Sequence, residues 1–201
     1  MIRVANAPVS YGAFELTVGV LPNVPGPDEL LDAIASAGYA GTELGPLGYL
    51  GRGDELRSRL GSRGLALAGA FVQIRFGSGD LSELEGTLDV LEGFGAKPVL
   101  CDQGPRDGDV DLGSVERAVE LARARGFEPT FHHHMGTRVQ TPAEIERLLA
   151  GTSVGLVLDT GHLVAGGGDP GRALGDWRDR VDHVHVKDVS LAAIGAAVSW
   201  D

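Results

Sequence analysis

The sequence contains a single cysteine, Cys101, among its 201 residues. One cysteine cannot pair within the chain, so a fold held by internal disulfides is excluded. Basic residues are also scarce: 17 Lys and Arg stand against 28 Asp and Glu, which gives a formal net charge of −11. Because binding to a phosphate backbone requires clustered Lys and Arg, nucleic acid is not expected as a partner.

Long hydrophobic runs are missing as well. The longest apolar stretches, such as residues 64–72, fall far short of the ~20 residues that cross a bilayer. The opening residues, MIRVANAPVS, lack the long apolar segment of a signal peptide. We therefore expect a cytoplasmic protein with no membrane partner.

The residues that are present predict one ordered domain. The chain is 43% hydrophobic and 22% charged, as in soluble globular proteins, and is too short for two ordinary domains. We therefore expect residues 1–201 to form a single domain. The 31 glycines suit a chain that alternates short elements, because glycine favours turns and helix ends.

A short apolar run, a Gly/Pro-rich loop and an amphipathic stretch recur along the chain. Glycines that lead into the apolar runs lie about 25 to 31 residues apart, which is about one strand-helix step. Leu81, Leu84, Leu88 and Leu91 recur at helical spacing, and Thr141-Pro142 with Glu144 marks a helix start. Seven strands are predicted, at Ile2–Asn6, Ala40–Leu44, Ala66–Val72, Pro98–Asp102, Phe127–His132, Val154–Asp159 and Asp182–Lys187.

Polar residues stand at the C-terminal ends of nearly all these strands. A closed barrel gathers such ends around one pocket, whereas an open doubly wound sheet binds its ligand at a single switch point. We therefore predict an α/β fold of the (β/α)8 TIM-barrel type. A flavodoxin-like or Rossmann sheet is the alternative, although no glycine-rich nucleotide-binding motif follows a strand.

The predicted barrel lacks its eighth strand. Fourteen residues follow Lys187, and a barrel of this kind typically takes about 250 residues in all. The resulting open edge predicts association with another chain, in the form of a homo-oligomer.

Three histidines in a row follow the fifth predicted strand, in the segment FHHHMGT. If the strand continues, His132 and His134 share one face and His133 points away. Two imidazoles would then enter the barrel mouth, one as a metal ligand and the other as a substrate or proton-transfer group. The alternative is a polar strand end whose histidines are satisfied by ordinary hydrogen bonds.

Two further motifs follow the sixth and seventh strands. In DTGH, Asp159 can supply a hard metal ligand and His162 a neighbouring contact, or Asp159 can simply cap the next helix. In DHVHVKD, His183, His185 and Lys187 face one side of a strand. If that side faces inward, burying these side chains costs free energy unless they are paired or bind a metal. The alternative for this segment is a solvated edge strand.

Two polar strand ends remain open in role. Glu43 suits a substrate ligand, a base or a salt-bridge partner equally well. Cys101 and Asp102 could line the pocket, although a lone cysteine is more often a small buried residue.

The order of the motifs HHHMGT, DTGH and HVHVKD resembles the xylose isomerase-like barrel superfamily of sugar isomerases, epimerases and AP endonucleases. Within it, the segments NAPVSYGAFE, GTELGPLGYL and FHHHMGTRVQT are similar to the inosose dehydratases of inositol catabolism. The resemblance extends over essentially the whole chain.

This resemblance implies a divalent-metal site. The family's metal-binding Asp after the sixth strand falls on Asp159 and its His in the seventh strand on His185, while a position that is often Glu is His132 here. The family's last ligand, a Glu on an eighth strand, has no counterpart. We expect Mn²⁺ or Co²⁺, although such ligands also suit Zn²⁺ and Fe²⁺.

The implied activity is the dehydration of a keto-inositol, with a small sugar or polyol as substrate. His134 or His162 would move the proton and Lys187 would stabilise the oxyanion. Glu43, Gln73 and His183 are the candidate substrate-binding residues.

Three alternatives remain open. A sugar or sugar-phosphate isomerase or epimerase uses the same metal and the same proton abstraction. An endonuclease would need more ligands and a basic surface. A truncated relative that binds sugars without catalysis would keep the strand-end residues but have lost the last strand.

Overall fold

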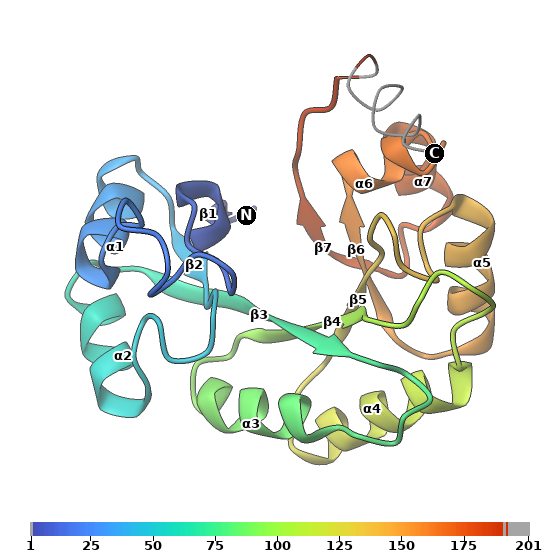
Figure 1. Cartoon of the computed structure of the whole chain (residues 1–201), viewed down its shortest axis with the longest axis horizontal. Helices are drawn as coiled ribbons and strands as arrows, with labels where there is room; N and C mark the ends of the chain where they lie inside the picture. Colours follow the sequence, from blue (N-terminus) through green and yellow to red (C-terminus); the bar gives the residue numbers. More distant parts are fainter. Residues whose placement is uncertain (1, 191, 193–201) are drawn as a thin grey trace. The chain divides into compact units, whose positions relative to one another are not determined.

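A computed structural model describes residues 2–190 and 192 of the chain. The seven predicted strands are all present, and helices separate them (Figure 1). In the hydrogen-bonded sheet each strand neighbours the next in sequence, in the order β1-β2-β3-β4-β5-β6-β7. This order is that of a barrel-type sheet; a doubly wound sheet reverses its order at a switch point. The Rossmann and flavodoxin-like alternative is therefore excluded, and no eighth strand occurs among residues 2–190 and 192.

The described residues fall into two units by their internal contacts. The first unit holds the residues up to Phe71 together with Glu85–Pro98, and the second holds Val72–Leu84 and the residues from Val99 onward. The last segment of the sequence, 191 and 193–201, lies outside the described residues, and most of the fourteen residues after Lys187 belong to it.

The first unit carries the N-terminal strands. Its elements are β1 (Ala5–Asn6), a 3-10 helix (Pro8–Tyr11), α1 (Pro27–Ser36), β2 (Gly41–Glu43), α2 (Gly53–Gly61), most of β3 (Ala66–Ile74) and most of α3 (Ser82–Leu91). β1, β2 and β3 pair in parallel. The helices bury their apolar faces completely, as Leu30, Ile34 and Leu56 illustrate.

Gly41 lies where β2 approaches β3 most closely. It pairs with Ala66, and a Cβ atom added to Gly41 would overlap the carbonyl oxygen of Ala66. Since both atoms belong to paired backbones, neither can move without distorting the sheet. Glycine at this position lets the two strands pair.

We expect Gly41→Ala to destabilise the protein by about 1–3 kcal/mol, as overpacking of a buried site does. The matched control is Gly86→Ala, because Gly86 lies within α3 and an added Cβ atom would meet nothing there. Alanine in that helix should instead stabilise by about 0.5–1 kcal/mol. Urea unfolding of both variants measures the difference, and equal effects at the two positions would contradict this role of Gly41.

The second unit carries the C-terminal strands. Its elements are β4 (Lys97–Asp102, from Val99), α4 (Leu112–Ala124), β5 (Thr130–His132), α5 (Pro142–Gly151), β6 (Gly155–Asp159), α6 (Thr160–Ala165), α7 (Pro170–Asp176) and β7 (Val181–His185). β4 to β7 pair in parallel, with Thr130 opposite Gly155 and Asp159 opposite His185. Parallel pairing brings the ends of β5, β6 and β7 to one edge of the sheet (Figure 1).

Five of the strands are shorter than the sequence predicts, and local hydrogen bonds give the reason for two of them, β5 and β7. β5 begins at Thr130 and not at Phe127, because the Phe127 N–H bonds to the carbonyl of Ala122 at the end of α4 and Pro129 has no N–H. β7 ends at His185 and not at Lys187, because the Lys187 N–H bonds to the Thr160 side chain. Both differences arise from local hydrogen bonds that compete with the sheet.

The predicted helix signals are confirmed. Leu84, Leu88 and Leu91 of α3 are fully buried. α5 begins at Pro142 with a capping box in which Glu144 accepts the Thr141 N–H. No helix among residues 2–190 and 192 is long and apolar enough to cross a bilayer.

Candidate metal centre and active site

Three potential metal ligands are each the last residue of a strand. His132 ends β5, Asp159 ends β6 and His185 ends β7. The Asp159 carboxylate is fully buried, and one of its oxygens, Oδ2, lies 3.2 Å from His132 Nε2 and 3.6 Å from His185 Nδ1. The donor atoms of the three residues all lie within 4.8 Å of one another. The sequence-predicted ligand set is thus brought together at one point.

These residues fit a divalent cation. Zn²⁺ and similar ions bind imidazole nitrogen and carboxylate oxygen at about 2.0–2.2 Å, and catalytic sites use three protein ligands with an open position for substrate or water. Histidine binds a metal through its neutral form. Burial, opposed by the hydrogen bond with Asp159, lowers the pKa of His132 to about 4, so its imidazole is neutral at pH 7.

Asp159 also organises the start of α6. Its second oxygen, Oδ1, accepts the backbone N–H of His162 at 2.9 Å, so the carboxylate caps this helix while Oδ2 faces the histidines. Burial alone would raise the pKa of Asp159. Hydrogen bonds from His132, His185, the His162 N–H and Lys187 outweigh it and hold the pKa well below the ordinary value. The carboxylate is therefore ionised at pH 7.

Lys187 reaches the same carboxylate from beyond the end of β7. Its Nζ lies 2.7 Å from Asp159 Oδ2 and 3.1 Å from His162 Nε2. The backbone of Lys187 is fixed by Thr160, whose Oγ1 accepts the Lys187 N–H at 2.8 Å, and its side chain packs against Gly161, where a Cβ atom would lie 2.8 Å from Lys187 Cβ. The Lys187 side chain as a whole is about half exposed.

His134 and His162 lie against each other beside these groups, with their ring planes tilted by 46°. Their ring centroids are 3.8 Å apart, and the His134 ring lies 5.6 Å from that of His132. His134 Nδ1 lies 2.7 Å from the carbonyl oxygen of Met135, a contact in which Nδ1 carries the proton and leaves Nε2 as the acceptor. Burial lowers the pKa of both residues, that of His162 to about 3, so both rings are neutral at pH 7.

The site holds one histidine whose task the sequence did not reveal. His133 is fully buried, and its Nε2 accepts the backbone N–H of Asp159 at 3.3 Å. It points away from the His132–His134 pair, as strand alternation predicts, but onto the backbone of the neighbouring strand. His133 thus positions Asp159 from behind. Thr160, directly after Asp159 in the DTGH segment, is a second supporting residue that residue type alone did not single out.

The family model of the xylose isomerase-like TIM barrel matches residues 31–195 of this chain. The chain belongs to this family.

Relatives in the xylose isomerase-like family include dehydratases. The chain is 34% identical over 189 residues to an inosose dehydratase of Lacticaseibacillus casei, covering 81% of this chain and 63% of the relative. It is 30% identical over 224 residues to an inosose dehydratase of Geobacillus kaustophilus, covering 93% of this chain and 69% of the relative. The chain therefore spans about two thirds of the length of these relatives.

Solved structures of the family share the fold at lower identity. A probable 3-DHS dehydratase from Bacillus anthracis superposes with a TM-score of 0.71 at 14% identity, covering 96% of this chain and 75% of that one. A xylose isomerase-like TIM barrel protein from Mycobacterium smegmatis, solved in complex with magnesium, gives 0.68 at 18% identity, covering 96% of this chain and 78% of that one. These likenesses establish the fold.

The predicted substrate-binding residues are placed differently from one another. His183 lies on the same face of β7 as His185, with ring centroids 5.2 Å apart. Gln73 lies near the end of β3 and lines a cavity of about 130 Å³ that shares no lining residue with the metal-ligand group. Glu43 is half-buried at the end of β2, in the first unit. Of these three candidates, His183 is the one that lies on the same strand as a proposed metal ligand, His185.

Cys101 and Asp102 lie at the end of β4. Both side chains are buried, and burial raises the pKa of the Cys101 thiol to about 12, which makes it unreactive. The Asp102 carboxylate is bound by Arg138, with Nη2 at 2.7 Å from Oδ1. The alternative stated for Cys101, a small buried residue, is therefore confirmed.

Proposed function

We propose that this chain catalyses the metal-dependent dehydration of a keto-inositol or a closely related keto-polyol, as a divalent-metal hydro-lyase. The observation that carries the proposal is the convergence of His132 and His185 on one carboxylate oxygen of Asp159, with Lys187 beside it. The names of the inosose dehydratase relatives support the reaction class. The proposal includes Mn²⁺ or Co²⁺ as the metal and a single domain as the catalytic unit.

The metal would be held by His132, Asp159 and His185, and when bound it supplies a Lewis acid that withdraws electrons from the substrate ketone. The rest of the chemistry falls to side chains. A carbon next to a ketone loses its proton more easily when positive charge lies near the oxygen. The Lys187 ammonium group, which lies 2.7 Å from Asp159 Oδ2, can supply this charge.

Proton transfer is assigned to the neighbouring imidazoles of His134 and His162. His134 accepts the proton at Nε2, because its Nδ1 is used by the carbonyl of Met135. The electrons of the broken C–H bond form a carbon–carbon double bond as the β-hydroxyl group departs. The His134 imidazolium returns the proton to that hydroxyl group, so water leaves and the neutral base is restored. His162 lies against His134 and is the alternative base.

We expect the purified chain to convert 2-keto-myo-inositol into an α,β-unsaturated hydroxyketone, the enol form of a diketone, when Mn²⁺ or Co²⁺ is present. Protein stripped of metal with a chelator should be inactive, and added metal should restore turnover and raise the melting temperature. Asp179→Ala is the matched control, because this carboxylate is 95% exposed and should leave both readouts unchanged.

Two outcomes would contradict the proposal. Absence of metal binding, seen as no bound ion and no thermal shift, would exclude a metal enzyme of either class. Exchange of the substrate's carbon-bound hydrogen for deuterium without loss of water would instead indicate an isomerase or epimerase, since these share the proton abstraction.

A further inference from the structure

The segment from His134 to Val139 forms a closed turn. The His134 N–H donates to the carbonyl of Val139 at 3.0 Å, and the Thr137 hydroxyl group donates to the carbonyl of His134 at 2.8 Å. The hydrogen bond that orients the His134 ring, to Met135, also lies within this turn. The direction of the His134 ring therefore depends on the conformation of the turn.

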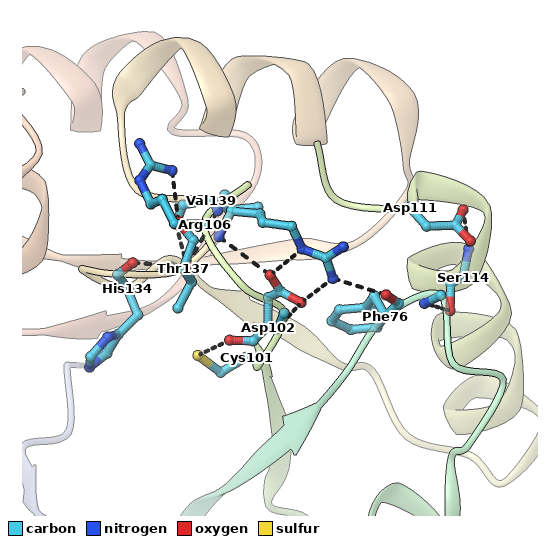
Figure 2. Close-up of polar contacts among 12 residues, drawn as sticks. Phe76, Cys101, Asp102, Arg106, Asp111, Ser114, His134, Thr137 and Val139 are labelled. Atoms are coloured by element: carbon cyan, nitrogen blue, oxygen red, sulfur yellow. Dashed lines mark hydrogen bonds and ion pairs between the residues drawn. The ribbon is translucent and has the colours of Figure 1, made fainter. Parts of the chain in front are cut away.

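One side chain near the end of this turn ties it to the neighbouring loops. Arg138 donates from Nε to Asp102 Oδ2 at 2.9 Å, from Nη2 to Asp102 Oδ1 at 2.7 Å, and from Nη2 to the carbonyl of Phe76 at 2.9 Å. Figure 2 shows Asp102 inside this network, between Thr137 and the carbonyl group of Phe76. We call Asp102, Gly104, Arg138 and the Phe76 carbonyl the Arg138 clamp.

Both oxygens of the Asp102 carboxylate are fully used as hydrogen-bond acceptors. Besides the guanidinium group, it accepts the N–H of Gly104 at 3.0 Å and the N–H of Arg138 at 3.3 Å, and its side chain is fully buried. Asp102 is therefore not a metal ligand or a base. A bidentate Arg–carboxylate pair fixes the relative orientation of the two side chains in addition to pairing their charges. Lysine cannot form such a pair.

Gly104 shows that the space around the guanidinium group is fully used. A Cβ atom added to Gly104 would overlap the guanidinium group of Arg138. The backbone of this loop therefore lies directly against the clamp. A buried ion pair often adds little net stability, because desolvation offsets the attraction. The role of the Arg138–Asp102 ion pair is therefore better explained by the conformation that it imposes on the turn than by added stability.

We propose that Arg138, held by Asp102, is a positioning residue that fixes the turn 134–139 and so aims His134 Nε2 for proton transfer. This inference rests on the proposed dehydratase function. Arg138 acts through the turn, because its side chain bonds to Asp102 and to the carbonyl group of Phe76. Loss of the clamp should misalign His134 without removing any group of the site.

The test compares Arg138→Lys and Asp102→Asn with Arg147→Lys as the control. Arg147 forms an exposed ion pair with Asp109, and this conservative variant should behave as the unaltered chain. For both clamp variants we expect kcat to fall by about 10- to 100-fold, as for groups that orient catalytic residues, while KM and Mn²⁺ affinity change less than about twofold. Long-range ¹H–¹⁵N NMR at pH 7 should show a proton on Nδ1 of His134 in the control and a mixture of tautomers in the clamp variants.

The two readouts separate the possible failures. Unchanged kcat and an unchanged His134 tautomer in a folded variant would overturn the inference, even if the melting temperature falls. If the unaltered chain has no dehydratase activity, the proposed function fails, and the NMR result alone decides whether the clamp fixes His134. Should Arg138→Lys not fold, Gly104→Ala replaces it, because the added methyl group displaces the guanidinium group while every polar partner stays in place.

Discussion

Replacing Asp159 with alanine is expected to lower turnover by more than about 100-fold and to abolish the thermal shift caused by Mn²⁺ or Co²⁺. Residues that only orient metal ligands typically cost 10- to 100-fold when removed, so losing the shared ligand should cost more. Asp159 is the residue on which His132, His185 and Lys187 all converge. Steady-state kinetics and calorimetric metal titration measure the two effects.

Asp159→Asn distinguishes the ligand role of Asp159 from its capping role. Asparagine is a good helix N-cap, so the bond to the His162 N–H should persist and α6 should still form. The amide lacks the charge that binds a divalent ion and pairs with Lys187. We therefore expect Asp159→Asn to fold with a circular dichroism spectrum like that of the unaltered chain but to bind metal poorly. Turnover that survives in either variant would show that the chemistry takes place elsewhere.

The sequence predicts the architecture well because two signals agree. Apolar runs about one strand-helix step apart predict the strands, and the polar residues at their ends predict the barrel-type order. The structure contains all seven strands. Their ends are predicted less well, since hydrogen bonds of single residues decide them. Pro129 and the Phe127 N–H shorten β5, and Thr160 takes the Lys187 N–H from β7.

The ligand set could be predicted because parallel strands carry their last residues to one edge. His132, Asp159 and His185 each end a strand, so their convergence follows once the strands are paired. The supporting residues could not be found this way. Arg138 and Asp102 are 36 positions apart, and nothing in the sequence around either residue indicates that they form an ion pair.

Glu144→Gln is expected to lower the free energy of unfolding by roughly 3 kcal/mol at pH 7. Glu144 Oε2 accepts the N–H groups of Gln140 and Thr141 at 2.9 and 2.8 Å, and Oε1 lies 2.9 Å from Arg106 Nη1. Burial would raise the pKa of Glu144, but these hydrogen bonds dominate and lower it from 4.5 to about 2. Glutamine resembles the protonated carboxyl group and can still serve in a capping box, so the substitution isolates the effect of the charge.

The same pKa shift fixes how this stabilisation depends on pH. Since the folded-state pKa is depressed, the contribution is fully present above the unfolded value of 4.5 and disappears as the pH falls toward about 2. The difference between Glu144→Gln and the unaltered chain should therefore fall to about half near pH ~3. Urea unfolding between pH 7 and pH ~3 measures it, with Glu146→Gln, exposed on the same helix, as the control. A difference that stays constant over this range would show that Glu144 acts through its shape alone.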